Sequence, residues 1–159
     1  MHDAEKAEII ERLNGAFPQF VPHNRALGMR FVDFDREAGV AVMSLPWEPH
    51  LVGNPDTGVL HGGVVTSLLD ATCGAAVFVR MWVPIPIATL DLRIDYLRPA
   101  TPRLAVVAKA TCYKVTRHVA FLRALAFHDD EADPIASAAG AFMLSTKGSP
   151  AVRVEGGPR

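Results

Sequence analysis

A long apolar run, Leu60 to Val79, limits the possible folds of this chain more than any other feature. Between Asp56 and Arg80 the only formally charged residue is Asp70. A carboxylate in such a run is costly to bury unless it is paired, hydrogen-bonded or used in chemistry. We therefore interpret Asp70 as the functional centre of the protein, and a structural carboxylate that caps a neighbouring loop is the alternative.

The same run has about the length of a membrane span. Its first turn holds Gly62-Gly63, however, and further polar residues interrupt it: Thr66, Ser67, Asp70 and Thr72. These interruptions favour a buried core helix, which we expect over residues 62–82. Pro84 and Pro86 end that helix, because proline cannot continue it.

Strand patterns follow the helix and also precede it. The segment Met29–Glu37, the turn Ala38-Gly39 and the segment Val40–Leu45 predict a hairpin. Residues 46–57 read as a loop. Four later strands are predicted: Ile87–Leu97, Leu104–Val115, Val119–His128 and Ile135–Leu144. Alternation in the first of these places Thr89 on one face with Arg93 and Asp95, and Leu92 on the other.

Helical periodicity at Ala4–Phe17 predicts an N-terminal helix, and prolines and a glycine over residues 18–28 indicate an irregular connection. Half of the 159 residues are hydrophobic, which is enough to build the core of one domain. We expect residues 1–28 to be the N-terminal helix and connection, residues 29–145 the domain, and residues 146–159 a flexible tail. The order of elements predicts an α+β fold, with a curved antiparallel sheet wrapped around the long helix.

Charge and cysteine usage argue against several classes of protein. The formal net charge is −1 and no cluster of Lys and Arg is present, so we expect no nucleic-acid partner. The N-terminus has no signal-peptide pattern, which favours a cytoplasmic protein without a membrane partner. Cys73 and Cys112 lie in apolar segments and predict reduced, buried thiols. No Cys or His spacing indicates a metal site.

The start of the long helix has the elements of an oxyanion site. The N–H groups of Gly62 and Gly63 lack intrahelical partners and lie at the positive end of the helix dipole. A plain helix start is the alternative interpretation. Asp70 lies roughly two turns further on, ~11 Å along the axis, with a side chain too short to reach a carbon bound at its own Gly62.

Several of these stretches resemble one known family. The string Asn54-Pro-Asp-Thr-Gly-Val-Leu-His-Gly-Gly63, followed by Leu68-Leu69-Asp70, is similar to the motif of the PaaI-like (phenylacetate-degradation type) branch of the hot-dog acyl-CoA thioesterases. Residues 89–99 and Ala138–Ser145 resemble later strands of that family. The resemblance implies a single hot-dog thioesterase domain. It also implies an acyl-CoA substrate, no cofactor beyond the CoA of that substrate, and a homodimer that pairs into a homotetramer.

The family's active site is shared across the dimer, so the resemblance implies that Gly62 of one subunit faces Asp70 of the other. Asp70 would act as general base on water or as nucleophile. Asn54 would bind the thioester or the water, with an Asn-Pro turn as the alternative. Thr89 would assist the carboxylate, with an ordinary strand threonine as the alternative. His61 would position other groups, with a satisfied half-buried histidine as the alternative.

Further assignments concern the two ends of the substrate. Arg98 and Arg117 are candidates for the phosphates of CoA, because guanidinium groups suit phosphate, and solvated loop arginines are the alternative. Candidate pocket residues indicate an aryl or medium-chain acyl group: Phe78, Met81 and Trp82. A non-catalytic acyl-CoA-binding hot-dog protein is the alternative function. A hydratase would need a histidine paired with the carboxylate, and none lies at a matching spacing from Asp70.

Overall fold

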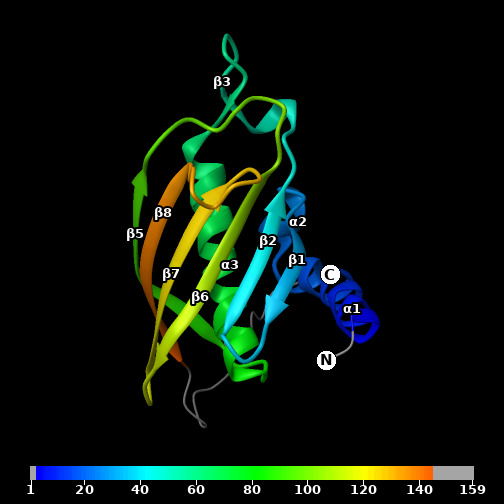
Figure 1. Ribbon diagram of the computed structural model, residues 1–159, viewed down its shortest axis with the longest axis vertical. Coiled ribbons are helices and arrows are strands. Elements are labelled where there is room, and N and C mark those ends of the chain that lie inside the picture. The colour runs from blue at the N-terminus through cyan, green and yellow to red at the C-terminus, as the bar shows by residue number, and fades with distance from the viewer. Residues whose placement is uncertain (1–2, 145–159) are drawn as a thin grey trace, which may run out of the picture.

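The computed structural model describes residues 3–144, without the side chains of residues 3 and 17–20. The predicted tail at residues 146–159 lies outside this range. A six-stranded antiparallel sheet curves around one long helix, α3 (Gly62–Met81), in strand order β1-β2-β6-β7-β8-β5 (Figure 1). The strands are β1 (Arg30–Asp35), β2 (Val40–Leu45), β5 (Ile87–Tyr96), β6 (Val106–Val115), β7 (Val119–Phe127) and β8 (Ala136–Leu144). The predicted α+β arrangement of sheet and central helix is confirmed.

Helix α3 is held at both ends by local contacts. His61 is its N-cap, and the Trp82 N–H donates to the carbonyl of Phe78 at 2.7 Å to close its last turn. Within the described range α3 is the one helix long and apolar enough to cross a membrane. Here the sheet covers it, and its sheet-facing side chains are fully buried: Leu68, Leu69, Cys73, Ala76 and Val77. The prediction of a buried core helix is therefore correct.

The N-terminal helix α1 (Asp3–Phe20) lies beside β1 at the edge of the sheet (Figure 1). Ile9, Ile10 and Leu13 pack against the core, as the periodicity predicted. The Asn14 side chain makes two hydrogen bonds to the backbone of Phe31. Its Nδ2 donates to the Phe31 carbonyl at 3.0 Å, and its Oδ1 accepts from the Phe31 N–H at 2.7 Å. This pairing fixes the position of α1 against the sheet.

Two segments that the sequence predicted as irregular contain short regular elements. Residues Pro22–Ala26 form the helix α2, because proline is well tolerated in the first turn of a helix although it breaks helix interiors. The predicted loop contains the 3₁₀ turn η1 (Pro49–Leu51). It continues into a small hairpin of β3 (Val52–Asn54) and β4 (Val59–Leu60). This hairpin projects beyond the end of the sheet (Figure 1).

A β-bulge at Leu90 changes which face of β5 carries Thr89. Thr89 pairs with Phe142 on β8, but Asp91 pairs with the very next residue, Ala141. The extra residue shifts the alternation, so Thr89 faces α3 instead of sharing the outer face with Arg93. The face predicted for Thr89 from strict alternation was therefore wrong, and the bulge is the reason.

Candidate active site

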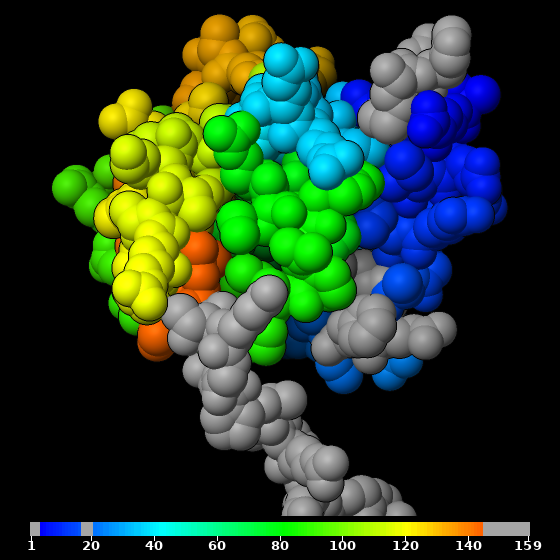
Figure 2. Space-filling model, turned by 90° about the horizontal axis from the view of Figure 1, so that it is seen from below, coloured from blue at the N-terminus to red at the C-terminus, as the bar shows by residue number. Residues whose placement is uncertain are grey.

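A cavity of about 1000 Å³ lies between the N-terminal helices, one face of α3 and the start of β5. Its polar lining consists of His23, Asn24, Ser67, Asp70 and Thr89. The rest is mainly apolar and includes Leu13, Val21, Phe78, Trp82, Ile85, Ile87 and Phe142. The cavity therefore combines a large apolar wall with a few polar groups. Seen from below, the C-terminal end of α3 (green) lies between α1 (blue) and the β6–β7 turn (yellow) (Figure 2).

The cavity-facing side of α3 follows helical spacing. Ser67, Asp70, Gly74 and Phe78 are three or four residues apart, so they share one face. Gly74 has no side chain to fill the cavity, and an added Cβ would lie in ordinary contact with Ile87 Cδ1, at 3.4 Å. The face that the sheet leaves open thus carries two polar residues and a glycine toward the start of α3, and Phe78 toward its end.

Asp70 is half-buried in this cavity and bonded to Thr89. The Thr89 hydroxyl donates to Asp70 Oδ1 at 2.8 Å, although the two residues are 19 positions apart. No other hydrogen bond and no ion pair of the Asp70 side chain occurs among the described residues. Oδ2 is therefore available to a water molecule or a substrate.

The neighbouring cysteine does not compete with Asp70 as a nucleophile. Cys73 is free and buried, and burial, followed by the negative charge of Asp70, raises the pKa of its thiol to about 12. The thiol therefore stays protonated near neutral pH, and a thiolate is the nucleophilic form. Cys112 is likewise free and buried, so the prediction of reduced, buried cysteines is confirmed.

At the start of α3 the two glycines differ. The Gly63 N–H donates to the ring Nδ1 of the N-cap residue His61 at 2.9 Å, and its role as an oxyanion donor stays a prediction. The signal missed was capping, in which a side chain at the N-cap takes a first-turn N–H. The Gly62 N–H has no partner among the described residues. Gly62 therefore keeps its donor, and His61 acts locally as a cap.

Asn54 forms part of the β3–β4 turn. Its Oδ1 accepts from the Asp56 N–H at 3.0 Å, and its carbonyl accepts from the Gly58 N–H at 2.8 Å. Gly58 has φ +73°, a conformation that favours glycine. Asn54 does not line the Asp70 cavity. Within one chain these contacts support the turn interpretation.

Three polar residues of the cavity were not predicted. His23 Nε2 lies 3.1 Å from Ser67 Oγ, which itself donates to the Gly63 carbonyl at 3.0 Å. When the Ser67 hydroxyl donates to the Gly63 carbonyl, the His23 tautomer that carries its proton on Nε2 donates to Ser67. The position of Ser67, three residues before Asp70, was a detectable signal, whereas His23 and Asn24 meet α3 only through the tertiary fold.

Comparisons with known proteins agree with this geometry. Residues 57–135 match the sequence profile of the thioesterase superfamily. The medium/long-chain acyl-CoA thioesterase YigI of Escherichia coli K12 is 31% identical over 155 residues, covering 89% of this chain and 96% of YigI. The chain belongs to the thioesterase superfamily. The predicted hot-dog fold and thioester hydrolase class are thereby confirmed.

Solved structures support the fold of this thioesterase. A Pseudomonas aeruginosa protein is 40% identical with a TM-score of 0.74, covering 84% of this chain and 97% of that one. A mutant of the phenylacetic acid degradation protein PaaI from Thermus thermophilus is 24% identical with a TM-score of 0.65. That match covers 77% of this chain and 97% of PaaI. The latter similarity concerns the fold alone.

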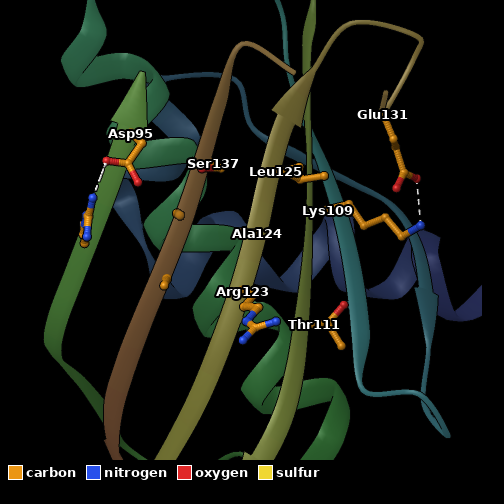
Figure 3. A pocket seen from close by; sticks show the side chains of 11 residues that line it. Asp95, Lys109, Thr111, Arg123, Ala124, Leu125, Glu131 and Ser137 are labelled. Atoms are coloured by element: carbon orange, nitrogen blue, oxygen red, sulfur yellow. Dashed lines mark hydrogen bonds and ion pairs between the residues drawn. The ribbon is translucent and has the colours of Figure 1, made fainter. Parts of the chain in front are cut away.

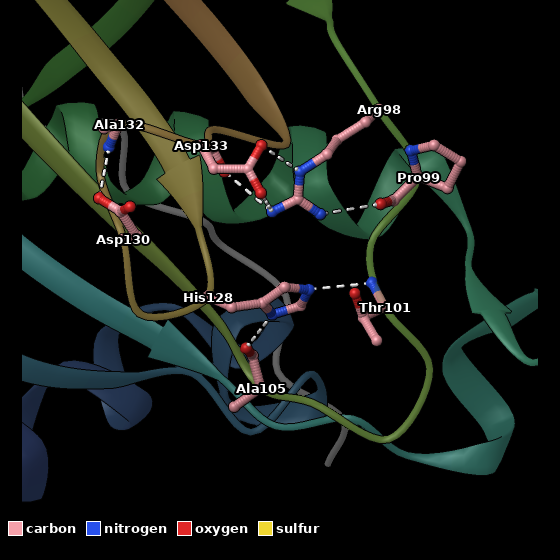
Figure 4. Close-up of polar contacts among 8 residues, drawn as sticks. All are labelled: Arg98, Pro99, Thr101, Ala105, His128, Asp130, Ala132 and Asp133. Atoms are coloured by element: carbon pink, nitrogen blue, oxygen red, sulfur yellow. Dashed lines mark hydrogen bonds and ion pairs between the residues drawn. The ribbon is translucent and has the colours of Figure 1, made fainter.

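In this thioesterase Arg98 is already bound within its own chain. Its guanidinium contacts both carboxylate oxygens of Asp133, at 3.0 and 2.9 Å, and donates to the Asp133 and Pro99 carbonyls (Figure 4). These contacts occupy the guanidinium N–H groups that would bind a phosphate, and the role of Arg98 in CoA binding stays a prediction. Arg117 lies exposed in the β6–β7 turn, and its predicted role stays a prediction.

The outer face of the sheet carries a second, smaller hollow of about 450 Å³ (Figure 3). Its charges are paired, with Lys109 bound to Glu131 at 2.7 Å and Arg93 bound to Asp95 at 3.0 Å. The Arg123 guanidinium lies over the ring of Tyr113, 5.1 Å from its centre. The sheet separates this hollow from Asp70, so it does not form part of the candidate active site.

Proposed function

We propose that this thioesterase hydrolyses acyl-CoA thioesters whose acyl group is a medium or long chain. The observation that carries the proposal is the Asp70–Thr89 pair, which lies at the wall of a large apolar cavity. Its volume of about 1000 Å³ is at the upper end of ordinary ligand sites. An acyl chain fits such a cavity better than a small aryl group does. The similarity to a medium/long-chain acyl-CoA thioesterase supports the same substrate class.

Asp70 is proposed to act as a general base. Its free Oδ2 takes a proton from a water molecule, whose oxygen forms a bond to the thioester carbonyl carbon. The tetrahedral intermediate then collapses, the C–S bond breaks, and the proton passes to the CoA sulfur. The Thr89 hydroxyl holds Oδ1 and so orients the carboxylate. Direct attack by Asp70 would instead leave a mixed anhydride, which mass spectrometry of a quenched reaction would detect.

The oxyanion donor is proposed to be the Gly62 N–H of a second copy of the chain. Within one chain Gly62 lies roughly two helical turns from Asp70, too far for both groups to act on one carbonyl. An interface is available at β5, which is an edge strand of the sheet, since apolar side chains are exposed on it and directly after it: Leu90, Tyr96 and Leu97. A two-fold dimer would complete two sites, each with Asp70 from one subunit and Gly62 from the other. Further pairing into a tetramer stays a prediction.

A thiol-release assay on acetyl-, hexanoyl-, decanoyl-, palmitoyl- and phenylacetyl-CoA tests the function. We expect kcat/KM to rise from acetyl to the longer chains as more apolar surface is buried, and phenylacetyl-CoA to be a poorer substrate. Preference for phenylacetyl-CoA would contradict the proposed acyl class. Tight binding of acyl-CoA without any thiol release would support the non-catalytic alternative.

Proline at position 62 tests the oxyanion donor by removing one N–H. Gly62 is the first residue of α3, where proline is well tolerated, and His61 has ψ 134°, as a residue before proline prefers. Gly62→Pro should lower kcat by about 10²–10³-fold and keep the melting temperature. Gly62→Ala keeps the N–H and is the matched control, with near-normal kcat expected. Equal activity of the two variants would rule out this donor.

Hybrid dimers test the shared site. A Gly62→Pro subunit and an Asp70→Asn subunit are each expected to be inactive alone. In a hybrid, one site carries both substitutions and the other carries neither, so activity should partly return. If verified hybrids stay inactive, both groups must act within one subunit or not at all.

A further inference from the structure

Asn24 is a buried polar residue whose side chain has no partner in the described part of the chain. It lies in α2, is 6% exposed, and uses its carbonyl to accept from the Met29 N–H at 3.0 Å. No hydrogen bond of its side-chain amide occurs among the described residues. In the same range no sealed side-chain nitrogen or oxygen lacks a partner. The Asn24 amide therefore reaches open space, and the space that it lines is the Asp70 cavity.

The surroundings of Asn24 make this amide unusual. Most of the cavity wall is apolar, and the nearby polar pair, His23 and Ser67, is bonded to itself. A plain alkyl chain in the cavity would displace water from the amide and leave both its donor and its acceptor unsatisfied, which is unfavourable. A ligand that brings its own hydrogen-bonding group would remove that penalty.

The charge of the cavity limits what this group can be. Its lining contains no lysine or arginine and does contain the Asp70 carboxylate. An acyl chain with a second carboxylate would meet repulsion and no cation, so an anionic group is disfavoured. An amide both donates and accepts, which suits a neutral hydroxyl or carbonyl oxygen.

We infer that Asn24 determines specificity by hydrogen-bonding an acyl chain that carries a hydroxyl or oxo group beyond the thioester. The inference rests on the proposed acyl-CoA hydrolysis and assigns the N-terminal segment a role in it. Asn24 has no hydrogen bond with Asp70 or Thr89 among the described residues, so its proposed role is to select the substrate and not to act on the reacting bond.

The test compares kcat/KM for decanoyl-CoA with that for its 3-hydroxy, 3-oxo and 10-hydroxy forms. The wild-type protein should prefer at least one oxygenated form. Asn24→Leu, which has similar size and no hydrogen-bonding group, should raise kcat/KM for decanoyl-CoA and lower it for the preferred form. We expect the ratio of the two to change by about tenfold or more. Arg25→Ala, an exposed neighbour that does not line the cavity, is the control and should leave the ratio unchanged.

Two results would overturn the inference. One is a wild-type protein that hydrolyses decanoyl-CoA at least as well as every oxygenated form. The other is an Asn24→Leu variant that loses activity equally on all substrates, since this would indicate a role in positioning the thioester or in folding. If Asn24→Leu does not fold, Asn24→Ala is judged by the same ratio. A wild-type protein that hydrolyses no acyl-CoA at all would instead refute the proposed function.

Discussion

The two faces of helix α3 differ in composition and in what they do. The face toward the sheet carries Leu69, Cys73 and Ala76, which are fully buried and pack against strands. The face toward the cavity carries Asp70 and Gly74, which leave a space and a carboxylate oxygen without a partner among the described residues. A carboxylate is tolerated in this apolar helix because it lies on the face that the sheet does not cover. One face therefore supplies stability, and we propose that the other supplies the chemistry.

Among substitutions on the two faces of α3, Asp70→Asn should have the largest effect on activity. The amide is nearly isosteric with the carboxylate but neither basic nor nucleophilic, so kcat should fall by about 10³-fold or more. The melting temperature should stay close to that of the wild type, because the substitution leaves the sheet face intact. Thiol-release kinetics and thermal unfolding measure the two effects. A near-normal kcat would refute the proposed mechanism.

Leu69→Ala changes the opposite face one position away. Truncating this fully buried leucine should lower the free energy of unfolding by about 2–5 kcal/mol. Urea unfolding measures the loss, and kcat of the folded fraction should stay within a few-fold of the wild type. If activity fell as far as in Asp70→Asn at full stability, the two faces would not be functionally separate.

Thr89→Val tests the bond that orients Asp70. It removes the hydroxyl that donates to Oδ1 at 2.8 Å, and a hydrogen bond to a charged group contributes about 1.5–3 kcal/mol. We expect kcat to fall by about 10–100-fold. Thr111→Val in β6, which lines the outer hollow, is the matched control and should leave kcat unchanged. Equal kcat in both variants would favour the ordinary strand threonine.

Gly74→Ala should have the smallest effect. It should raise the stability and narrow the range of accepted acyl chains. Alanine in a helix interior is favoured over glycine by about 0.5–1 kcal/mol, and the new methyl would lie 3.4 Å from Ile87, an ordinary contact. The melting temperature should rise slightly, and the longest accepted acyl chain should become shorter. The thermal melt and the acyl-CoA panel measure both. Lower stability would mean that the cavity wall is packed more tightly than described.

The sequence by itself determined the elements whose signals are local. The apolar run predicted α3, alternation predicted the strands of the sheet, and the lone charge identified Asp70 as the residue to examine. The predictions of α3 and of the strands succeeded because hydrophobic periodicity records, position by position, which side of an element is buried. The motif from Asn54 to Gly63 added the family, which the comparisons confirm.

Only the tertiary structure decided which of the candidate groups meet. The bulge at Leu90 brought Thr89 to Asp70. Asp133 bound Arg98 from 35 positions away, and α2 carried Asn24 into the cavity wall. The physical reason is common to these three cases. Each group has many chemically equivalent neighbours in the sequence, and only the folded backbone decides which of them lie side by side.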